Sequence, residues 1–407
     1  MKSILFVDDE SKILDGIKRM LHGDRHRWNL QFVVGGQAAL LAFETGSFDV
    51  VISDMLMPGM DGATLMGHIR ERSPKTARII LSGFSDAILS ARAASVAHRF
   101  LSKPCSATDL QSAIEHVCTL QELVCSPEIC RIVGSVGELP SHSTTFIKLR
   151  EAVANPDASM VIVASIIEQD IAMSAKILQL TNSAFFGLAQ KVSNLQNAVA
   201  YLGMETIKNL ALASEAFRMF LPDARVPQSV CDSIQQHSLR AAAIAAVLPL
   251  NRETRELTIL AAHLHDIGRL FLASTMPLEF CSTLDLSLER GCKPFEAEEQ
   301  LLGTSHAEIG AYLLGLWGIP NLAVEAIAHH HRPTRISHSE MDCTVAVYLA
   351  DFLAHELDAH PTGSMGCEVS EADRACLETL NLISKLDAFR ELALQSCNES
   401  GSRSDSI

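Results

Sequence analysis

The sequence predicts a doubly wound α/β domain followed by an almost wholly helical region. Over about the first 120 residues, short apolar runs rich in β-branched residues, such as Ile4–Val7 and Val50–Ile52, alternate with amphipathic stretches. Such runs are typical of buried parallel strands with helices on both faces of the sheet. From Thr144 to about Ser396 the apolar residues follow the helical period, and Gly, Pro and Asn mark the loops.

Carboxylates follow two of the predicted strands directly. Asp8 and Asp9 come after Ile4–Val7, and Asp54 ends the run that starts at Val50. In parallel sheets, ligand sites gather beyond the carboxyl ends of the strands. Three carboxylates that converge there repel one another unless a hard cation lies between them, and Mg²⁺ suits an oxygen-only site. The sequence therefore predicts a magnesium site.

A lysine and a hydroxyl follow two further strands. Lys103 comes after Phe100-Leu101-Ser102, and Ser82 comes after Ile79-Ile80-Leu81. Mg²⁺, a lysine, a hydroxyl and a nucleophilic aspartate can together accept and hold a phosphoryl group. We therefore expect phosphoryl chemistry at this edge of the sheet.

In this order and spacing, these residues resemble the receiver domain of two-component response regulators over about residues 1 to 120. The resemblance implies a five-stranded parallel sheet and a histidine kinase as phosphodonor. It also implies that the chain is a phosphoprotein of a phosphorelay. A buried core aromatic explains Phe100 about as well as a switch role does. The roles implied are phosphoacceptor for Asp54, Mg²⁺ ligands for Asp8, Asp9 and Asp54, and switch or phosphate-contacting residues for Ser82, Phe100 and Lys103.

Composition limits the classes of partner. A net charge of −15 argues against direct nucleic-acid binding, which needs an electropositive face. No apolar stretch reaches the length of a membrane span, and the amino terminus enters a strand within four residues, so we expect neither a membrane anchor nor a signal peptide. The 11 cysteines show no C-x-x-C spacing and fit reduced thiols. We expect a cytoplasmic protein.

The helical region carries a second set of residues with metal-binding chemistry. A carboxylate can bridge two metal ions while imidazoles fill terminal positions, and a bridging water then becomes a strong nucleophile. This is the logic of HD-type phosphohydrolases. We expect an Fe or Mn pair if the set binds metal. The candidate ligands are His237, His265, Asp266, His306, His330, His331 and Asp351, with His329 left outside and the register uncertain by one residue.

The context of these residues is similar to the HDOD domain over roughly residues 135 to 350. The similarity rests on the segments 264–269, 303–310 and 316–320. HDOD domains are an offshoot of the HD superfamily and are regarded as signalling modules without established catalytic activity. Two departures from the related HD-GYP phosphodiesterases favour that interpretation: Arg332-Pro333 stands where those enzymes have Gly-Tyr-Pro, and Arg269 replaces a lysine that Arg does not mimic.

The positions of Gly and Pro between the predicted elements suggest the domain boundaries. We expect a receiver domain over 1–122, a linker over 123–138 and an all-helical HDOD output domain over 139–355. A helical extension would follow over 356–395. The polar residues 396–407 would be disordered.

Three functions are compatible with these features. In the first, a histidine kinase phosphorylates Asp54, and the HDOD domain then acts by binding a partner protein or a nucleotide, with homodimerisation as one outcome. In the second, the chain is a phosphorylation-gated metal-dependent phosphohydrolase of a (cyclic) nucleotide. In the third, it is a nucleotide-binding sensor whose receiver only dimerises. A purely structural role for the histidines, with Asp266 paired to Arg269, is also open.

Overall fold

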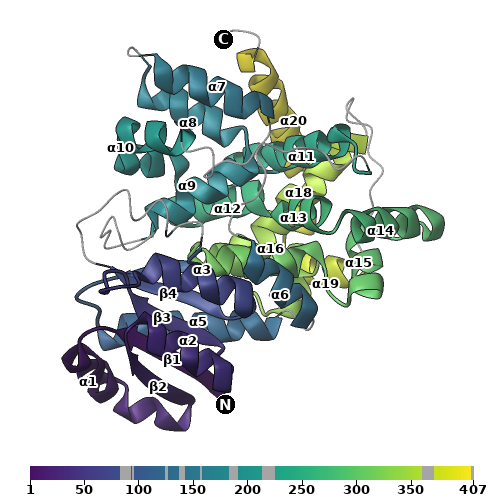
Figure 1. Cartoon of the computed structure of the whole chain (residues 1–407). Helices are drawn as coiled ribbons and strands as arrows, with labels where there is room; N and C mark the ends of the chain where they lie inside the picture. Colours follow the sequence, from purple (N-terminus) through teal and green to yellow (C-terminus); the bar gives the residue numbers. More distant parts are fainter. Residues whose placement is uncertain are drawn as a thin grey trace. The chain divides into compact units, whose positions relative to one another are not determined.

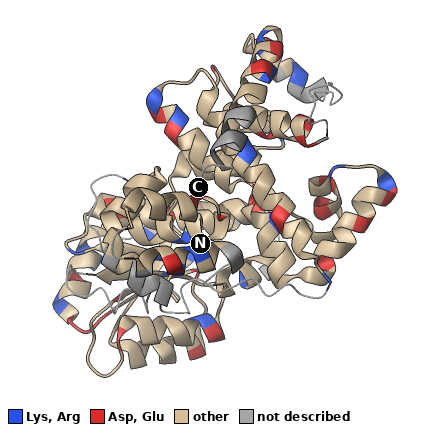
Figure 2. Ribbon diagram, turned by 90° about the horizontal axis from the view of Figure 1, so that it is seen from above, with Lys and Arg blue, Asp and Glu red and all other residues tan. Residues whose placement is uncertain are grey.

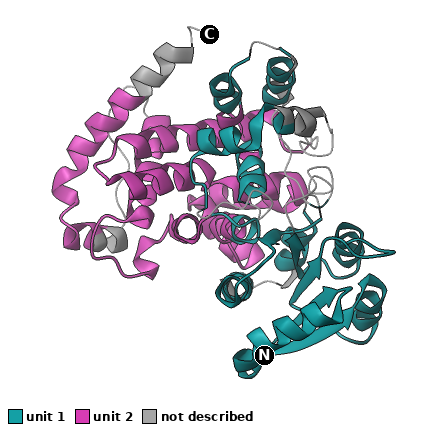
Figure 3. Ribbon diagram, turned by 90° about the vertical axis from the view of Figure 1, so that its left-hand side faces the viewer, with its two compact units in different colours: residues 1–166, 173–219, 312–319 teal, residues 167–172, 220–311, 320–407 magenta. Residues whose placement is uncertain are grey.

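The computed structural model of the chain describes residues 1–82, 93, 96–123, 127–136, 143–155, 158–182, 191–212, 225–359 and 371–404. The chain divides into two compact units, coloured separately in Figure 3. Unit 1 comprises 1–166, 173–219 and 312–319, and unit 2 comprises 167–172, 220–311 and 320–407. The two units are therefore not continuous along the chain, because a short segment of the helical region belongs to the same unit as the amino-terminal domain.

The amino-terminal part of unit 1 is the doubly wound α/β domain that the sequence predicts (Figure 1). Its five strands are all parallel in the order β2-β1-β3-β4-β5. The strands are β1 (Lys2–Asp8), β2 (Trp28–Val34), β3 (Val50–Asp54), β4 (Ala77–Ser82) and β5 (Arg99–Ser102). The helices are α1 (Ser11–Met20), the 3₁₀ turn η1 (His22–His26), α2 (Gly36–Thr45), α3 (Gly62–Arg72) and α5 (Ala107–Leu123).

The central strands form because their residues are buried on both faces of the sheet. Every residue of β3 and β4 is buried, which explains why these strands read as continuous apolar runs rather than alternating ones. In register, Ile52 of β3 lies beside Phe6 of β1 and Ile79 of β4. Leu5, Val51 and Ile80 belong to one core cluster together with residues of α2 and α3. This register brings the carboxyl ends of β1, β3 and β4 to one edge.

The turn after β3 fixes the position of Asp54. A Cβ at Gly62 would lie 2.3 Å from the backbone oxygen of Asp54, so only glycine allows this approach. The Gly62 N–H donates to Met55 O (2.8 Å), and the Asp61 carboxylate caps α3 by accepting from the N–H of Thr64 (2.7 Å). The loop is therefore held against the strand end that carries Asp54.

The remaining helices of unit 1 begin with α6 (Pro127–Ser135), which a buried arginine ties to the sheet. The Arg78 side chain is 1% exposed and donates to the carbonyl of Gly134 (2.6 Å) and to that of Val96 (2.6 Å). Burial lowers the pKa of Arg78 to about 9, and carbonyl oxygens solvate the guanidinium in place of a carboxylate. Further along are α7 (Ser143–Ala154), α8 (Met160–Glu168), α9 (Ile171–Thr181) and α10 (Leu195–Leu212).

All the secondary-structure elements described in unit 2 are helices. Its core packs α11 against α12 and α18, with α17 on α18. Helix α18 continues past the domain boundary expected at residue 355, and α20 continues to Ser404, into the segment for which we expected disorder. The elements are α11 (Gln228–Val247), α12 (Arg252–Leu264), α13 (Ile267–Thr275), α14 (Pro277–Arg290), α15 (Pro294–Leu302), α16 (His306–Leu316), α17 (Asn321–His329), η3 (Pro333–Arg335), α18 (Cys343–Ala359), α19 (Glu371–Thr379), η4 (Ile383–Lys385) and α20 (Leu386–Ser404).

Basic and acidic residues are interspersed on the same helices in Figure 2. Among the described helices, none combines the length and the apolar character needed to cross a membrane.

The anchoring of α6 can be tested at Gly134. A Cβ there would lie 2.1 Å from the backbone oxygen of Pro74, so Gly134→Ala must push α6 away from the sheet and weaken the hydrogen bonds of Arg78. We expect the substitution to lower the free energy of unfolding by roughly 2 kcal/mol, as overpacking of a rigid contact does. The measurement is the urea midpoint followed by circular dichroism.

Gly16→Ala in α1 is the matched control, because no atom lies within 4 Å of its added Cβ. We expect this variant to be as stable as the wild type or slightly more stable. Equal midpoints for the two variants would contradict the role given to the α6 contact.

Candidate functional site

The carboxyl edge of the sheet brings together the three acidic residues singled out in the sequence. Asp8 ends β1 and is 1% exposed, and Asp54 ends β3 and is 9% exposed. Ligand oxygens of Asp8, Asp9 and Asp54 lie within 4.8 Å of one another. Carboxylate oxygens at this spacing fit the ligand preference of Mg²⁺, so the residues present suit the ion that the sequence predicts.

Lys103 supplies the positive charge at this edge. Its Nζ lies 2.6 Å from Oδ1 of Asp54 and 3.0 Å from Oδ2 of Asp8. Burial by itself would lower the pKa of Lys103, but the two carboxylates outweigh it and raise that pKa. Burial raises the pKa of Asp54, and Lys103 opposes the rise. The lysine thus keeps its proton and stays paired with both carboxylates.

Ser82 lies at the carboxyl edge of the sheet, whereas Phe100 lies in the hydrophobic core. Ser82 ends β4 and is 9% exposed, and its carbonyl accepts from the N–H of Lys103 (2.9 Å), so the two residues are held together. Phe100 in β5 is 6% exposed and belongs to the core cluster beneath α2 and α3. The core role weighed for Phe100 is therefore present, and its switch role stays a prediction.

Unit 2 brings together all seven candidate ligands of the helical region. They come from five places in the chain: α11, the junction of α12 with α13, the start of α16, the end of α17, and α18. Most are at most 5% exposed. The combinations with ligand atoms within 4.8 Å of one another are His237/His265/Asp351, His265/Asp266/His330 and His306/His330/His331. We call the seven residues the histidine cluster.

Two carboxylates organise the cluster. Oδ1 of Asp351 lies 2.9 Å from Nε2 of His237 and 3.4 Å from Nε2 of His265. Oδ1 of Asp266 lies 3.2 Å from Nε2 of His306 and 3.9 Å from Nε2 of His265. His265 is therefore shared between the two carboxylates, as expected for neighbouring positions of a dinuclear site.

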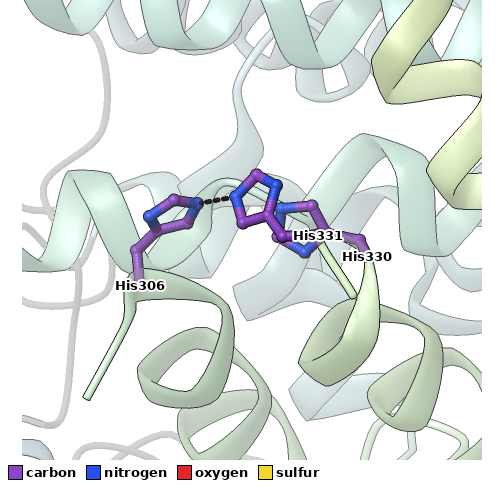
Figure 4. A group of neighbouring side chains, drawn as sticks. All are labelled: His306, His330 and His331. Carbon is purple, nitrogen blue, oxygen red and sulfur yellow. Dashed lines mark hydrogen bonds between the residues drawn. The ribbon is translucent and has the colours of Figure 1, made fainter. Parts of the chain in front are cut away.

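The imidazole of His306, at the start of α16, meets that of His331, two residues after the end of α17. Nε2 of His306 lies 2.9 Å from Nε2 of His331, with His330 directly beside His331 (Figure 4). Two ring nitrogens at this distance need a proton or a metal ion between them, because two lone pairs facing each other repel.

Hydrogen bonds on the far side of four rings turn Nε2 toward the cluster. Nδ1 of His265 donates to Ala262 O (2.6 Å), and Nδ1 of His330 donates to Ile327 O (2.7 Å). Carboxylates of Asp358 and Glu298 accept at 2.7 Å from Nδ1 of His237 and His306. Such partners fix the tautomer of metal-binding histidines.

The protonation state of His330 agrees with a ligand role. Burial and the neighbouring His265 lower the pKa of His330 to about 3, so its ring is neutral. Within the described part of the chain, Nε2 of His265 and Nε2 of His330 are buried and have no hydrogen-bond partner. Two orphaned acceptors beside two carboxylates fit a metal pair.

The structure also places the residues that the sequence left open. His329 is half-buried and belongs to none of these combinations among the described residues, as the chosen register implies. Nη1 of Arg269 lies 3.2 Å from Oδ2 of Asp266, so the pairing weighed as a structural alternative is present beside the cluster.

Sequence reasoning missed three polar residues around the cluster: Glu298, His355 and Asp358. His355 and Asp358 follow Asp351 by four and seven residues on α18. This spacing puts all three residues on one helix face, so the sequence alone could have indicated them. Glu298 lies on a different helix from His306, so no local spacing indicates it.

Glu298 gives the metal-free cluster a testable pH dependence. Burial would lower the pKa of His306, but Glu298 and Asp266 raise it to about 9, above the ordinary 6.5. Protonated His306 therefore stabilises the folded state. This contribution is fully present below about pH 6.5 and is lost as the pH rises through about 9. The shift corresponds to roughly 3 kcal/mol. Glu298→Gln should therefore destabilise the chelator-treated protein more at pH 6 than at pH 9.5.

The measurement is the urea midpoint of wild type and variant at both pH values. Glu299→Gln is the matched control, because Glu299 pairs with Arg332 instead of a cluster histidine. A Glu298→Gln deficit that does not change with pH would refute the assignment of the proton to His306.

Comparison with known proteins identifies both halves of the chain. The response regulator receiver domain matches residues 4–115, and the HDOD domain matches residues 139–333. An uncharacterized protein of Treponema pallidum is 26% identical over 208 residues, which are 49% of this chain and 39% of that protein. The sensor kinase CckA of Brucella abortus is 31% identical over 123 residues, 30% of this chain and 13% of the kinase. The chain thus spans well under two thirds of these relatives.

Two solved structures are similar to parts of the chain. The MmoQ response regulator of Methylococcus capsulatus is 22% identical with a TM-score of 0.46, over 62% of this chain and 98% of that one. The signal receiver domain of an HD domain-containing protein from Pseudomonas fluorescens is 32% identical with a TM-score of 0.29, over 30% of this chain and 97% of that one. By its two domain matches, the chain belongs to the response regulators that join an amino-terminal receiver domain to an HDOD domain.

Proposed function

We propose that Asp54 accepts a phosphoryl group from a sensor histidine kinase and that this modification switches the HDOD domain, which acts on a downstream protein or nucleotide. The observation that carries the proposal is the contact of Lys103 Nζ with the carboxylates of both Asp54 and Asp8, at 2.6 and 3.0 Å. One cation shared by an acceptor carboxylate and an acidic pair is an arrangement that can hold a phosphoryl group.

The chemistry follows from the residues at this edge. A carboxylate oxygen of Asp54 attacks the phosphorus of a phosphohistidine, the P–N bond breaks, and the kinase imidazole leaves with the electron pair. Mg²⁺ held by Asp8, Asp9 and Asp54 would neutralise phosphoryl charge. Lys103 then pairs with a phosphoryl oxygen instead of the free carboxylate, and the Ser82 hydroxyl donates a hydrogen bond to another.

Two contacts inside unit 1 offer a route from this edge toward the helical region. Arg78 lies on β4 four residues before Ser82 and holds the backbone of α6 through Gly134. Leu120 of α5 packs on Gly315 of α16, where an added Cβ would lie 2.3 Å from its Cδ1. A shift of β4 or α5 on phosphorylation would therefore reach elements outside the sheet.

A second candidate function is phosphohydrolysis of a (cyclic) nucleotide by a metal pair in the histidine cluster. The specific observation is that the Nε2 atoms of His237, His265, His306 and His330 face two buried carboxylates while their Nδ1 atoms are already bonded. An Fe or Mn pair would supply a Lewis acid and a metal-activated hydroxide. The ligands would be His237, His265, Asp266, His306, His330, His331 and Asp351.

Phosphorylation can be tested with a small-molecule donor. Incubation of the full chain with acetyl phosphate and Mg²⁺ should add one phosphoryl group, seen by intact mass or by retarded migration on a phosphate-affinity gel. Asp54→Asn should abolish the modification, because an amide is not a nucleophile here. The control Asp15→Asn, on the exposed side of α1, should be modified like the wild type. Equal modification of Asp54→Asn would show that another residue is the acceptor.

Metal content tests the cluster. Protein purified without oxygen and supplied with Fe²⁺ or Mn²⁺ should hold about two equivalents by elemental analysis, as expected for two ligand sets around a dinuclear site. The His265→Ala/Asp266→Ala variant should lose them, while Asp54→Asn should keep them. Metal-free wild type under these conditions would exclude the hydrolase function and leave the phosphorelay role untouched.

A further inference from the structure

His355 lies at the solvent side of the histidine cluster. Its side chain is 50% exposed, whereas that of His265 is fully buried. Nε2 of His355 lies 3.4 Å from Oδ1 of Asp351, and its ring stacks on His237 with the centroids 4.1 Å apart. Oδ1 of Asp351 is therefore surrounded by three imidazole Nε2 atoms, those of His237, His265 and His355, at 2.9, 3.4 and 3.4 Å.

A cation fits this arrangement. Nδ1 of His237 is bonded to Asp358 and Nδ1 of His265 to Ala262 O, which leaves Nε2 of both rings facing the Asp351 carboxylate. Without a metal ion, Nε2 of His237 and Oδ1 of Asp351 form a 2.9 Å hydrogen bond. A metal ion bound there would take the place of the shared proton and bind the ring nitrogens and the carboxylate as ligands.

We propose that His355 is an additional metal ligand, which completes a set of three histidines and one carboxylate and closes it toward solvent. The proposal rests on the metal binding proposed above and names a residue outside the seven expected ligands. The set is His237, His265, His355 and Asp351.

The other half of the cluster supports this composition. His306, His330 and His331 have ligand atoms within 4.8 Å of one another, and Nε2 of His306 lies 3.2 Å from Oδ1 of Asp266. Each of the two metal positions then has three imidazoles and one carboxylate. Without His355 the position at Asp351 would have only two of the three imidazoles that its counterpart has.

The consequence concerns access to the metal. Catalytic sites keep a ligand position open for water or substrate, whereas structural sites fill their positions with protein side chains. Because His355 is half-exposed, it takes the position that faces solvent. Removing this side chain opens the metal to small molecules and leaves the buried ligands in place.

Co²⁺ titration of the chelator-treated full chain tests the assignment, since the visible spectrum of Co²⁺ reports its ligands directly. Wild type should bind two equivalents. In His355→Ala, one of the two should bind at least about tenfold more weakly, the loss typical even for partners beyond the ligands themselves. Its spectrum should change, and free imidazole should restore it. In His265→Ala imidazole should not restore the spectrum, because that position is closed to solvent.

Two further variants separate loss of a metal ligand from a general effect of losing a histidine. His355→Gln, which keeps the length of the side chain but not the imidazole, should behave like His355→Ala. His329→Ala, a histidine outside the cluster, should titrate like the wild type, and circular dichroism checks the fold of all variants. A His355→Ala titration and spectrum that superimpose on those of the wild type would overturn the role of His355 alone. A wild type that binds no Co²⁺ would overturn the metal site and with it this proposal.

Discussion

Burial of carboxylates is the constraint on which both sites of this protein depend. Asp8, Asp54, Asp266 and Asp351 are each less than 10% exposed. A buried charge without a partner costs several kcal/mol, so each of these groups requires a cation beside it. In the receiver domain Lys103 serves two carboxylates at once, and its contacts explain why the loop after β5 lies against the ends of β1 and β3. In the helical region Asp266 has Arg269, whereas Asp351 faces the imidazoles of His237 and His265.

Three of these carboxylates, those of Asp8, Asp54 and Asp266, lie at the ends of secondary-structure elements, whereas Asp351 lies within α18. In the sheet, parallel register is sufficient: strands of similar length end at one edge, and their terminal side chains meet there. In the helical region the last carbonyls of a helix lack intrahelical donors. His265 and His330 each stand directly after the last residue of a helix and donate Nδ1–H to the carbonyl three residues back. The same hydrogen bond completes the helix end and turns Nε2 into the cluster, so local folding and ligand orientation have one cause.

The receiver site was predictable because it obeys these local rules. Buried β-branched runs indicated the strands, and the residues after them were the site. The seven residues of the histidine cluster were recognisable by residue type and order, although only the packing of α11, α12, α17 and α18 brings them together. His355 follows Asp351 at a helical spacing and was readable, whereas Glu298 reaches His306 through a tertiary contact that no spacing encodes. The two compact units were not predictable either, because packing assigns 312–319 to unit 1 against the order of the chain.

The residues after the paired histidines hold one ring of the cluster in place. Arg332 lies where the HD-GYP enzymes have their Gly-Tyr-Pro motif. Its guanidinium makes two 2.8 Å hydrogen bonds to Glu299 and lies over the ring of Phe295, 5.0 Å from the centroid. Phe295 in turn stacks on His331 with the centroids 4.4 Å apart. This segment therefore holds a ligand ring in place through packing and an ion pair.

On the opposite helix, His355 occupies the solvent side of Asp351. Protein side chains thus cover the cluster at both of its less buried ligand positions, those of His331 and His355. A metal pair enclosed in this way would stabilise one arrangement of α11, α16, α17 and α18, which is what an output module needs in order to present a defined surface after phosphorylation. If His355 binds the metal as proposed, the ligand chemistry that hydrolases use with an open position would serve signalling, because the chain itself would fill that position.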